Sequence, residues 1–403
     1  MLLLATKVWE QRQLREISSS TIGGGTPKSS NKKFWNGNIP WIQSSDLVNG
    51  DIWNITIKKH ITLDAVENSA AKIISANSIA VVTRVAVGKL VYMPLEYATS
   101  QDFISFQNLS GDHSFFMYLV SKVMHKVKGS LQGTSIKGIS KGELLKKKVI
   151  YTLNIKEQKK IGTLLKSLDT ILTLYERKLK LLSKTKKYFL QKLFVNGDQK
   201  HPVIRFREFN DDWKEKKLAQ LFKISNETNL DNKLCFSKQD VLSVSDKFGV
   251  VNQIKLQGRS FAGNNISKYK VVRNNQIVYT KSPLKDKPYG IIKIVSNIKG
   301  IVSPLYIVNN VIGNNAWFIY YYFDLKSRTN NYLKPLVRLG AKHTMNITDK
   351  EWLSGKIFIS EVIQEQEKIA NLLNMIDKLI RLNEQQLRNL EELKKCLLQN
   401  MFC

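Results

Sequence analysis

Two stretches of the chain carry apolar residues at alternating spacings of three and four, the pattern of a long helix with one narrow apolar stripe. A helix from Glu157 to Phe194 would be about 57 Å long, far more than an ordinary core helix. We expect each stripe to be buried against the other as a coiled coil; the alternative is that each helix packs onto its neighbouring domain. The stripe positions are Ile161, Leu165, Leu168, Leu172, Leu179 and Leu182 in the first helix and Ile369, Leu373, Ile376, Ile380, Leu387 and Leu390 in the second.

The two stretches are copies of each other. Residues 157–169 return as 365–377, an offset of 365 − 157 = 208, and the match continues without a gap to Phe194 and Phe402. A duplicated unit closes on its copy most simply about a two-fold axis, so we expect the helices to pair antiparallel. Polar residues at stripe positions, Asn383, Lys186 and Lys394, cost stability and typically fix register or orientation.

The duplication extends to the segments in front of the helices. Each is preceded by a capping box, Ser140 with Glu143 and Thr348 with Glu351, and then by a short strand-like run. Each half also begins with a similarly placed Trp and Leu, whereas the interiors share little. A chain that repeats its frame and varies its two inserts is suited to presenting two specificities.

These patterns predict an α+β protein with a pseudo-two-fold internal duplication. Two globular mixed α/β domains would be separated by two long helices that form an antiparallel coiled coil. The Gly197 stop and Pro202 mark the main boundary. We expect a first domain over 1–153, a first helix over 154–196, a second domain over 197–355 and a second helix over 356–403.

The charge of the chain favours a polyanionic partner. It carries 63 Lys and Arg against 33 Asp and Glu, a formal net charge of +30. Nucleic acid is the leading partner, although a lysine-rich protein with a merely basic surface remains an alternative. The apolar start is interrupted by Lys7 and no apolar run approaches about 20 residues, so we expect no export signal, no membrane contact and a cytoplasmic location.

The sequence offers no catalytic or metal-binding constellation. Three scattered cysteines and five histidines lack metal-ligand spacing, and no phosphate-binding loop or methyltransferase loop occurs. Acidic residues near Lys216 resemble nuclease spacings only by chance. We therefore expect a chain that is not an enzyme and binds no metal and no cofactor.

Several turn-rich segments have the side chains that read bases and fix phosphates. For any single member the alternative is an ordinary solvated polar residue. The candidate DNA-binding residues are Lys28, Ser29, Lys32, Lys33, Arg84, Lys89, Gln132, Thr134, Ser135 and Lys137 in the first half and Gln257, Arg259, Lys281, Ser282, Lys285, Lys287, Lys342, His343 and Thr344 in the second.

With these segments the chain resembles the specificity subunits of type I restriction-modification systems over nearly its whole length. Residues 25–47 resemble the opening of a target recognition domain, 133–140 and 157–169 its exit into a conserved spacer helix, and 205–218 the lead-in to a second such domain. One departure is that the first domain has only residues 1–8 before Trp9, without the full lead-in.

The resemblance implies a non-catalytic subunit that reads a bipartite site in double-stranded DNA. Two methyltransferase subunits would dock on the spacer helices and methylate adenine with S-adenosylmethionine, and restriction subunits with ATP and Mg would join for cleavage. The helices would set the gap between the half-sites. A free-standing sequence-specific DNA-binding regulator and a coiled-coil scaffold are the rival hypotheses; regulators typically read DNA with short helix-turn-helix units.

Overall fold

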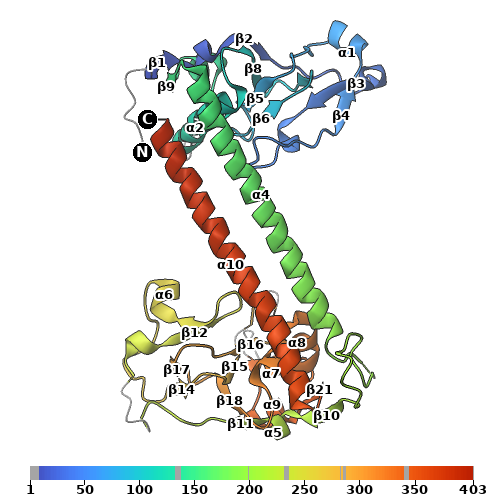
Figure 1. The fold of residues 1–403 in the computed structure, drawn as a ribbon, viewed down its shortest axis with the longest axis vertical. Helices are drawn as coiled ribbons and strands as arrows, with labels where there is room; N and C mark the ends of the chain where they lie inside the picture. Colours follow the sequence, from blue (N-terminus) through green and yellow to red (C-terminus); the bar gives the residue numbers. More distant parts are fainter. Residues whose placement is uncertain are drawn as a thin grey trace. The chain divides into compact units, whose positions relative to one another are not determined.

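The chain forms two compact units (Figure 1). A computed structural model describes residues 9–131, 138–197, 199–230, 236–281, 283–284, 287–339 and 345–402. Unit 1 takes in described residues up to 176 together with those from 385 onward, and unit 2 takes in 177–384. The long helices α4 (Ile155–Lys192) and α10 (Ile363–Met401) therefore contribute residues to both units. The predicted domain limits, which treat the helices as separate segments, stay a prediction.

Unit 1 combines a four-stranded antiparallel sheet of order β2-β8-β5-β6, a smaller sheet of order β4-β3-β7 and the pair β1-β9. The helix α2 lies beside the four-stranded sheet in Figure 1. Its elements are β1 (Trp9–Gln13), η1 (Leu14–Ile17), β2 (Ser18–Gly23), η2 (Lys32–Phe34), β3 (Trp35–Ile42), η3 (Ser44–Asp46), β4 (Lys59–Ile61), α1 (Leu63–Glu67), β5 (Ser78–Val82), β6 (Leu90–Met93), β7 (Ala98–Thr99), β8 (Phe103–Leu109), α2 (His113–Leu131), α3 (Lys141–Leu145) and β9 (Lys148–Thr152).

Unit 2 repeats this plan with a four-stranded antiparallel sheet of order β11-β18-β15-β16 and the pair β10-β21. Its elements are β10 (Lys214–Lys217), α5 (Leu218–Leu221), β11 (Phe222–Ile224), η4 (Lys238–Asp240), β12 (Leu242–Ser245), β13 (Gly249–Asn252), α6 (Gln253–Gln257), β14 (Lys270–Val272), β15 (Ile277–Thr280), β16 (Ile291–Ile294), β17 (Gly300–Val302), β18 (Ile307–Val311), α7 (Ala316–Asp324), α8 (Lys326–Leu333), β19 (Arg338–Leu339), β20 (Met345–Asn346), α9 (Asp349–Ser354) and β21 (Lys356–Ile359).

The frame around each sheet is duplicated as the sequence predicts. Both capping boxes form, with the Ser140 and Thr348 hydroxyls accepting hydrogen bonds from the backbone amides of Glu143 and Glu351. In unit 1 the Leu14 amide donates to the carbonyl of Lys147 at 2.8 Å. In unit 2 the equivalent bond joins Leu218 to Gly355 at 2.9 Å, and 355 − 147 equals the repeat offset of 208.

A tryptophan near the start of each half holds the first turn of a long helix. The indole nitrogen of Trp9 donates to Glu157 at 3.1 Å, and that of Trp213 donates to Glu365 at 3.2 Å. In unit 2 the Arg205 guanidinium also binds Glu365, at 2.7 Å from its Nε. Among the described residues, Glu157 has no arginine partner of this kind.

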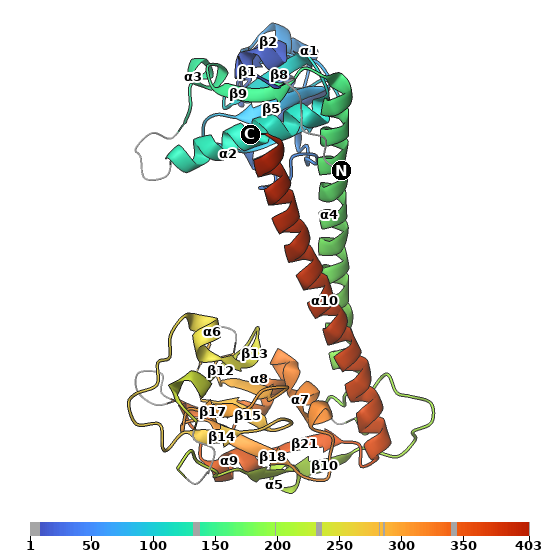
Figure 2. The same ribbon diagram turned by 60° about the vertical axis from the view of Figure 1, so that its left-hand side comes forward.

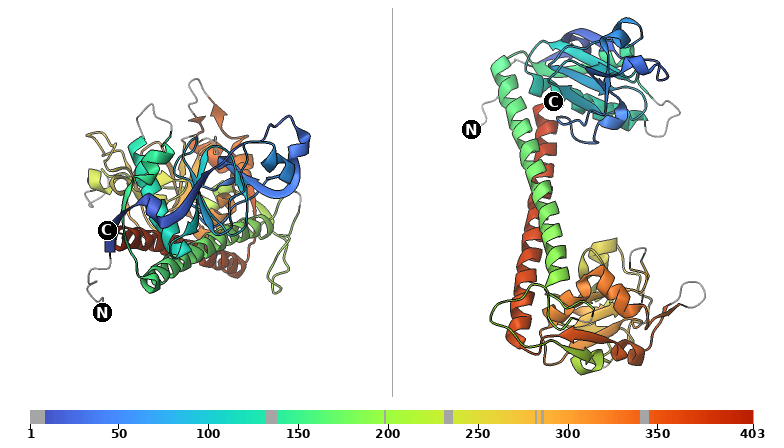
Figure 3. Two further views of the ribbon diagram at one scale, coloured as in Figure 1. Left: turned by 90° about the horizontal axis from the view of Figure 1, so that it is seen from above. Right: turned by 90° about the vertical axis from the view of Figure 1, so that its right-hand side faces the viewer.

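The core of each unit takes in the start of one long helix and the end of the other. In unit 1, Leu165 of α4 lies in a core with Phe402, which directly follows α10. In unit 2, Leu373 of α10 lies in a core with Phe194, which follows α4. The right-hand view of Figure 3 shows the start of α10 (red) and the end of α4 (green) at this unit. The beginning of each helix thus meets the end of the other inside each unit, the order of an antiparallel pair. The alternative that the helices pack onto neighbouring domains also holds for these terminal turns.

A cation from each unit binds the end of the incoming helix. Lys122 Nζ on α2 donates to the backbone carbonyls of Gln399 and Phe402 at the end of α10, which lies beside α2 in Figure 2. In unit 2 the buried Arg328 donates to the carbonyl of Leu190 at 2.8 Å. The last carbonyls of a helix lack intrahelical donors and carry negative partial charge, so both cations stabilise helix ends.

Stripe lysines that the sequence predicts to be costly have buried partners. In unit 1, Lys394 forms an ion pair with Asp169 and lies over the ring of Tyr118, with Nζ 5.8 Å from its centroid. The Tyr118 hydroxyl donates to the same carboxylate at 2.6 Å. We call this group the first clasp.

The second clasp in unit 2 repeats the first. Lys186 Nζ lies 2.7 Å from Asp377 and 5.5 Å from the ring centroid of Tyr321, whose hydroxyl donates to Asp377 at 2.9 Å. Asp377 is the copy of Asp169, because 377 − 169 = 208, and Lys394 is the copy of Lys186 by the same offset. Because one clasp joins early α4 to late α10 and the other late α4 to early α10, together they specify antiparallel register.

The middle of each stripe is half-buried, and the positions beside it are exposed. Leu172, Leu179 and Leu182 of α4 and Ile380 and Leu387 of α10 are intermediate in exposure. Asn383 is 5% exposed, and its side-chain amide donates to the carbonyl of Leu379 at 2.7 Å. Among the described helices none is long and apolar enough to cross a membrane.

Candidate nucleic-acid interface

The basic segment at Lys28, Ser29, Lys32 and Lys33 is an exposed turn on a rigid base. The Asn31 side chain accepts the amide of Lys33 at 3.2 Å, which caps the short η2 helix. The carbonyl of Lys28 accepts the amide of Asn31 at 3.0 Å. Phe34, directly after the lysines, is buried in a small apolar core beneath them. The segment thus presents three ammonium groups from a fixed backbone, as phosphate contact requires.

Close backbone approaches hold this turn in place. The indole nitrogen of Trp41 donates to the Gly25 carbonyl at 3.1 Å. A Cβ at Gly25 would lie 2.0 Å from the carbonyl oxygen of Ala70, so only glycine fits. Gly24 and Gly25, which follow the end of β2, are therefore packed closely against neighbouring backbone.

A described residue from the segment before α3 pairs with the candidate Arg84. This exposed residue forms an isolated bridge with Gly138, and the Ile139 amide donates to the carbonyl of Thr83 at 3.0 Å. Gly138 directly follows the candidates Gln132, Thr134, Ser135 and Lys137, which lie outside the described residues. Val85 has a φ of 40°, which is strained for a β-branched residue. Strained backbone is often kept at binding sites.

In unit 2 the exposed candidates Gln257 and Arg259 flank a helix stop. Gly258 ends α6 in the left-handed conformation, with a φ of 78°. The Arg259 guanidinium lies over the ring of Phe261, 4.7 Å from its centroid, and that ring is 58% exposed. A stacked arginine beside an exposed aromatic ring is a surface that suits nucleic acid.

Three candidate lysines are held by the chain itself. Lys89 Nζ donates to the carbonyl of Leu47 at 2.7 Å, and Lys281 Nζ to that of Ile347 at 2.8 Å. Lys287 is 9% exposed, and its Nζ lies 2.5 Å from Asp246. These contacts bind the three lysines within the chain, whereas the other described candidates are exposed. Ser282, Lys285, Lys342, His343 and Thr344 lie outside the described residues.

Sequence reasoning missed two cation–aromatic groups on the surface. Lys59 Nζ lies 5.6 Å from the ring centroid of Trp35 and 5.5 Å from that of Trp41. At the tip of the β12-β13 hairpin, Lys247 lies over Phe248, 5.3 Å from its centroid, and that ring is 57% exposed. The first group has no sequence signal, because Trp35 and Lys59 are distant in the chain. The second has one, because Lys247 and Phe248 are adjacent and precede a glycine that indicates a turn.

A chain of ion pairs runs from this hairpin to the second clasp. Asp246 lies 3.4 Å from Lys293, which lies 3.5 Å from Asp324, which lies 2.7 Å from Lys186. Burial alone would raise the pKa of Asp324, but Lys186 and Lys293 outweigh it and hold the pKa at about 2. Burial would likewise lower the pKa of Lys186, but Asp324 and Asp377 raise it above its ordinary value. Asp324 and Lys186 are therefore both charged at neutral pH.

Within the described ranges no group of three His, Cys, Asp or Glu side chains could hold a metal ion. Cys396 is a free, exposed thiol. The hypotheses that this chain binds no metal and no cofactor stay predictions.

These features define a class: an internally duplicated α+β protein whose two units share one frame and present different basic loops. Residues 6–184 match the family of the type I restriction modification DNA specificity domain. Similar proteins include the type I restriction enzyme MjaIX specificity subunit of Methanocaldococcus jannaschii, 26% identical over 232 residues, which are 55% of this chain and 54% of that protein.

The EcoR124I/EcoR124II specificity subunit of Escherichia coli is 32% identical over 174 residues, 40% of this chain and 41% of that protein. The chain spans about half the length of the curated relatives it matches. Among solved structures, the S subunit of a type I restriction-modification system from M. genitalium aligns with a TM-score of 0.61 at 15% identity, covering 100% of this chain and 98% of that one.

A second solved chain, from a study of complex assembly and conformational transition of the type I R-M system, gives a TM-score of 0.55 at 13% identity, with 98% of each chain covered. Residues 6–184 thus match a family of DNA specificity domains, and the fold of the chain is similar to that of these two solved chains.

Proposed function

We propose that this chain is the non-catalytic recognition subunit of a type I restriction-modification complex and reads a bipartite site in double-stranded DNA. The observation that carries the proposal is the contrast between frame and loops. Both units share one sheet order and one helix junction, but the exposed cationic loops differ. Two similar frames with different loops would read two different half-sites.

We propose two methyltransferase subunits as partners, docked on the long helices, and restriction subunits that join for cleavage. The chemistry would be adenine methylation with S-adenosylmethionine bound by the methyltransferase, and ATP and Mg would be bound by the restriction subunit. The complex would act in the cytoplasm. The antiparallel helices, held in register by the two clasps, would set the unspecified gap between the half-sites.

The experiment that tests this proposal exchanges one recognition interior. Residues 220–345 are replaced by those of a related subunit, with Tyr321 and Asp324 restored because they bind the long helices through Asp377 and Lys186. The chimera is expressed with the methyltransferase subunit in a host without adenine methylation, and the methylated sites are mapped. We expect one half of the methylated motif to change and the other half and the gap to stay.

A change in both half-sites would show that the units do not read DNA independently and would contradict the proposal. The rival hypothesis of a free-standing regulator is distinguished by binding. Tight sequence-specific binding by the chain alone, unaffected by added methyltransferase, would favour the regulator. A chain that binds no DNA with or without the methyltransferase would be a scaffold.

The exposed turn of unit 1 should bind DNA phosphates. For Lys32→Ala/Lys33→Ala we expect weaker binding to all sequences and a shallower salt dependence. The slope of log affinity against log salt concentration should fall by about 0.9 for each phosphate that is no longer neutralised. The methylated motif should not change, because phosphate contacts carry no base information.

The measurement is the binding of the methyltransferase complex to duplex DNA over a series of salt concentrations. Lys128→Ala/Lys146→Ala is the matched control, because it removes two exposed lysines of unit 1 that lie neither on the long helices nor among the candidate residues. An equally reduced slope in the control would mean that the effect reflects net charge and not this turn.

A further inference from the structure

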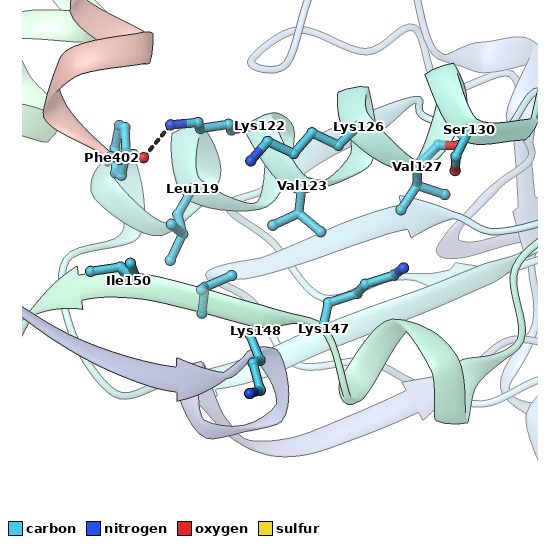
Figure 4. Close-up of a pocket in the computed structure, with 11 residues that line it drawn as sticks. Leu119, Lys122, Val123, Lys126, Val127, Ser130, Lys147, Lys148, Ile150 and Phe402 are labelled. Carbon is cyan, nitrogen blue, oxygen red and sulfur yellow. Dashed lines mark hydrogen bonds between the residues drawn. The ribbon is translucent and has the colours of Figure 1, made fainter.

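A groove with an apolar floor and a basic rim lies between α2 and β9 in unit 1 (Figure 4). It encloses about 380 Å³. Leu119, Val123 and Val127 from α2 face Val149 and Ile150 of β9, and Phe402 closes one end. We call it the α2–β9 groove. Ile150 is 39% exposed although it is a large apolar side chain in a strand, so the groove leaves apolar surface open to water.

Four lysines surround this floor. Lys122 is bound to the carbonyl of Phe402, and Lys126, Lys147 and Lys148 are exposed and make no ion pair with the described residues. Only the Ser130 hydroxyl adds a further polar group from α2, and it donates to the carbonyl of Val127 at 2.8 Å. The residues that line the groove thus include four lysines and no carboxylate.

In unit 2 the chain fills the corresponding place with its own side chain. Tyr321 on α7 has the role in the second clasp that Tyr118 on α2 has in the first, and Tyr332 lies on α8, the helix that follows α7. The Tyr332 ring packs on Gly355, the counterpart of Lys147, where an added Cβ would lie 2.4 Å from the ring. Its hydroxyl donates to the Trp352 carbonyl at 2.7 Å, and the residue is 8% exposed.

We infer that the α2–β9 groove is a docking site for an acidic amphipathic segment of a partner protein. Such a segment would place an apolar or aromatic side chain on the floor, as Tyr332 does in unit 2, and carboxylates against the lysine rim. Charge-assisted contacts on the rim and apolar burial on the floor are the two components of a peptide-binding groove. Because unit 2 fills its own groove, the partner segment would bind unit 1 alone.

Other occupants fit the groove less well. Duplex DNA would match the rim but has no apolar side chain for the floor. A second copy of this chain carries a net charge of +30 and would be repelled by the rim. The first residues of the chain include Lys7 and three leucines and no carboxylate, so they match the floor but not the charge.

The test measures binding of a fluorescein-labelled peptide that carries Phe and Leu on one face of a helix and Glu on the opposite face. A scrambled peptide of the same composition is the ligand control. Fluorescence anisotropy with the full chain should show at least about tenfold tighter binding of the ordered peptide. Lys126→Glu/Lys148→Glu should weaken binding about tenfold or more, because two attractive interactions become repulsive. Val123→Trp, which fills the floor, should weaken binding without a change in charge.

Lys128→Glu/Lys146→Glu is the matched protein control, since both lysines are exposed and neither lines the groove. It should bind the ordered peptide within about twofold of the unmodified chain. Equal weakening by the two double variants, equal binding of the scrambled peptide, or no binding of either peptide would overturn the proposal.

Three further outcomes would assign the groove to another occupant and overturn the proposal. These are loss of duplex DNA binding in Lys126→Glu/Lys148→Glu without any peptide affinity, a concentration-dependent dimer that this variant abolishes, and peptide binding that arises only when residues 2–7 are deleted. The methylated motif should be unchanged in the groove variants, which separates this test from that of the recognition function.

Discussion

Replacing Asp324 with asparagine is expected to lower the free energy of unfolding of unit 2 by about 3 kcal/mol at pH 7. The carboxylate is 11% exposed and lies 2.7 Å from Lys186 and 3.5 Å from Lys293. It also accepts the Tyr320 hydroxyl at 3.0 Å. Asparagine keeps the shape of the side chain and removes its charge. Lys186 and Lys293 therefore each lose one of their two carboxylate partners. The retained partners, Asp377 and Asp246, place the loss at the lower end for a broken buried pair.

The same carboxylate should make unit 2 sensitive to acid. Its pKa is held at about 2, below the ordinary value of 3.8, so its contribution is fully present above about pH 4 and is lost as the pH falls through about 2. The lowered pKa corresponds to about 2 kcal/mol. The difference in the free energy of unfolding between the unmodified chain and Asp324→Asn should therefore shrink by about that amount between about pH 5 and about pH 2.

Hydrogen exchange of α7, followed by mass spectrometry, reports the opening free energy of this unit. Glu367→Gln on the exposed face of α10 is the matched control and should leave α7 protection unchanged. An Asp324→Asn chain with normal α7 protection would mean that the ion-pair chain does not stabilise unit 2.

Removing the Phe402 ring is expected to destabilise unit 1 by about 3–5 kcal/mol, although the residue lies at the far end of the sequence. The side chain is 4% exposed, with its ring centroid 5.0 Å from that of Phe115 and 6.3 Å from that of Trp9. Phe402→Ala would leave a cavity among these rings and release the last turns of α10. Exchange of α2 and β9 should accelerate, while α7 in unit 2 stays protected.

Phe194→Ala is the reciprocal variant, because Phe194 lies 5.2 Å from Phe318 in the core of unit 2. It should accelerate exchange in α7 and leave α2 protected. Leu393→Ala, at a 46% exposed position of α10, is the control for helix truncation effects. If Phe402→Ala weakened both units equally, or neither, the end of α10 would not be an integral part of the core of unit 1.

The repeated frame could be predicted because its signals are local and occur twice. The stripe spacing predicts both long helices, the Ser140 and Thr348 boxes predict the capped turns, and the Trp9 and Trp213 positions predict equivalent starts. Antiparallel order followed from duplication alone, and contacts within each unit confirm it.

Roles that depend on distant partners could not be predicted. The ion pair of Lys287 with Asp246 is one such case, because the two residues are 287 − 246 = 41 positions apart, and the DNA contact expected of Lys287 stays a prediction. The sequence predicts that Lys186 and Lys394 destabilise the apolar stripe. Their partners, Asp377 and Asp169, are the two copies of one repeated aspartate and lie near the opposite end of the other helix. The signal was available in that repeat, since an antiparallel pair brings Asp169 to Lys394.

The shared cores have a consequence for the order in which the protein folds during synthesis. Trp9 and Phe402 are in contact but 402 − 9 = 393 residues apart, so the core of unit 1 cannot close until Phe402 has left the ribosome. Unit 2 meets no such delay, because 177–384 is continuous. Until then Phe115 and Leu165 remain exposed to solvent in the nascent chain. The final packing is also slow, because contacts of such high sequence separation form slowly. Packing of Phe402 beside Trp9 of β1 is therefore expected to be among the last steps of folding, although β1 is synthesised first.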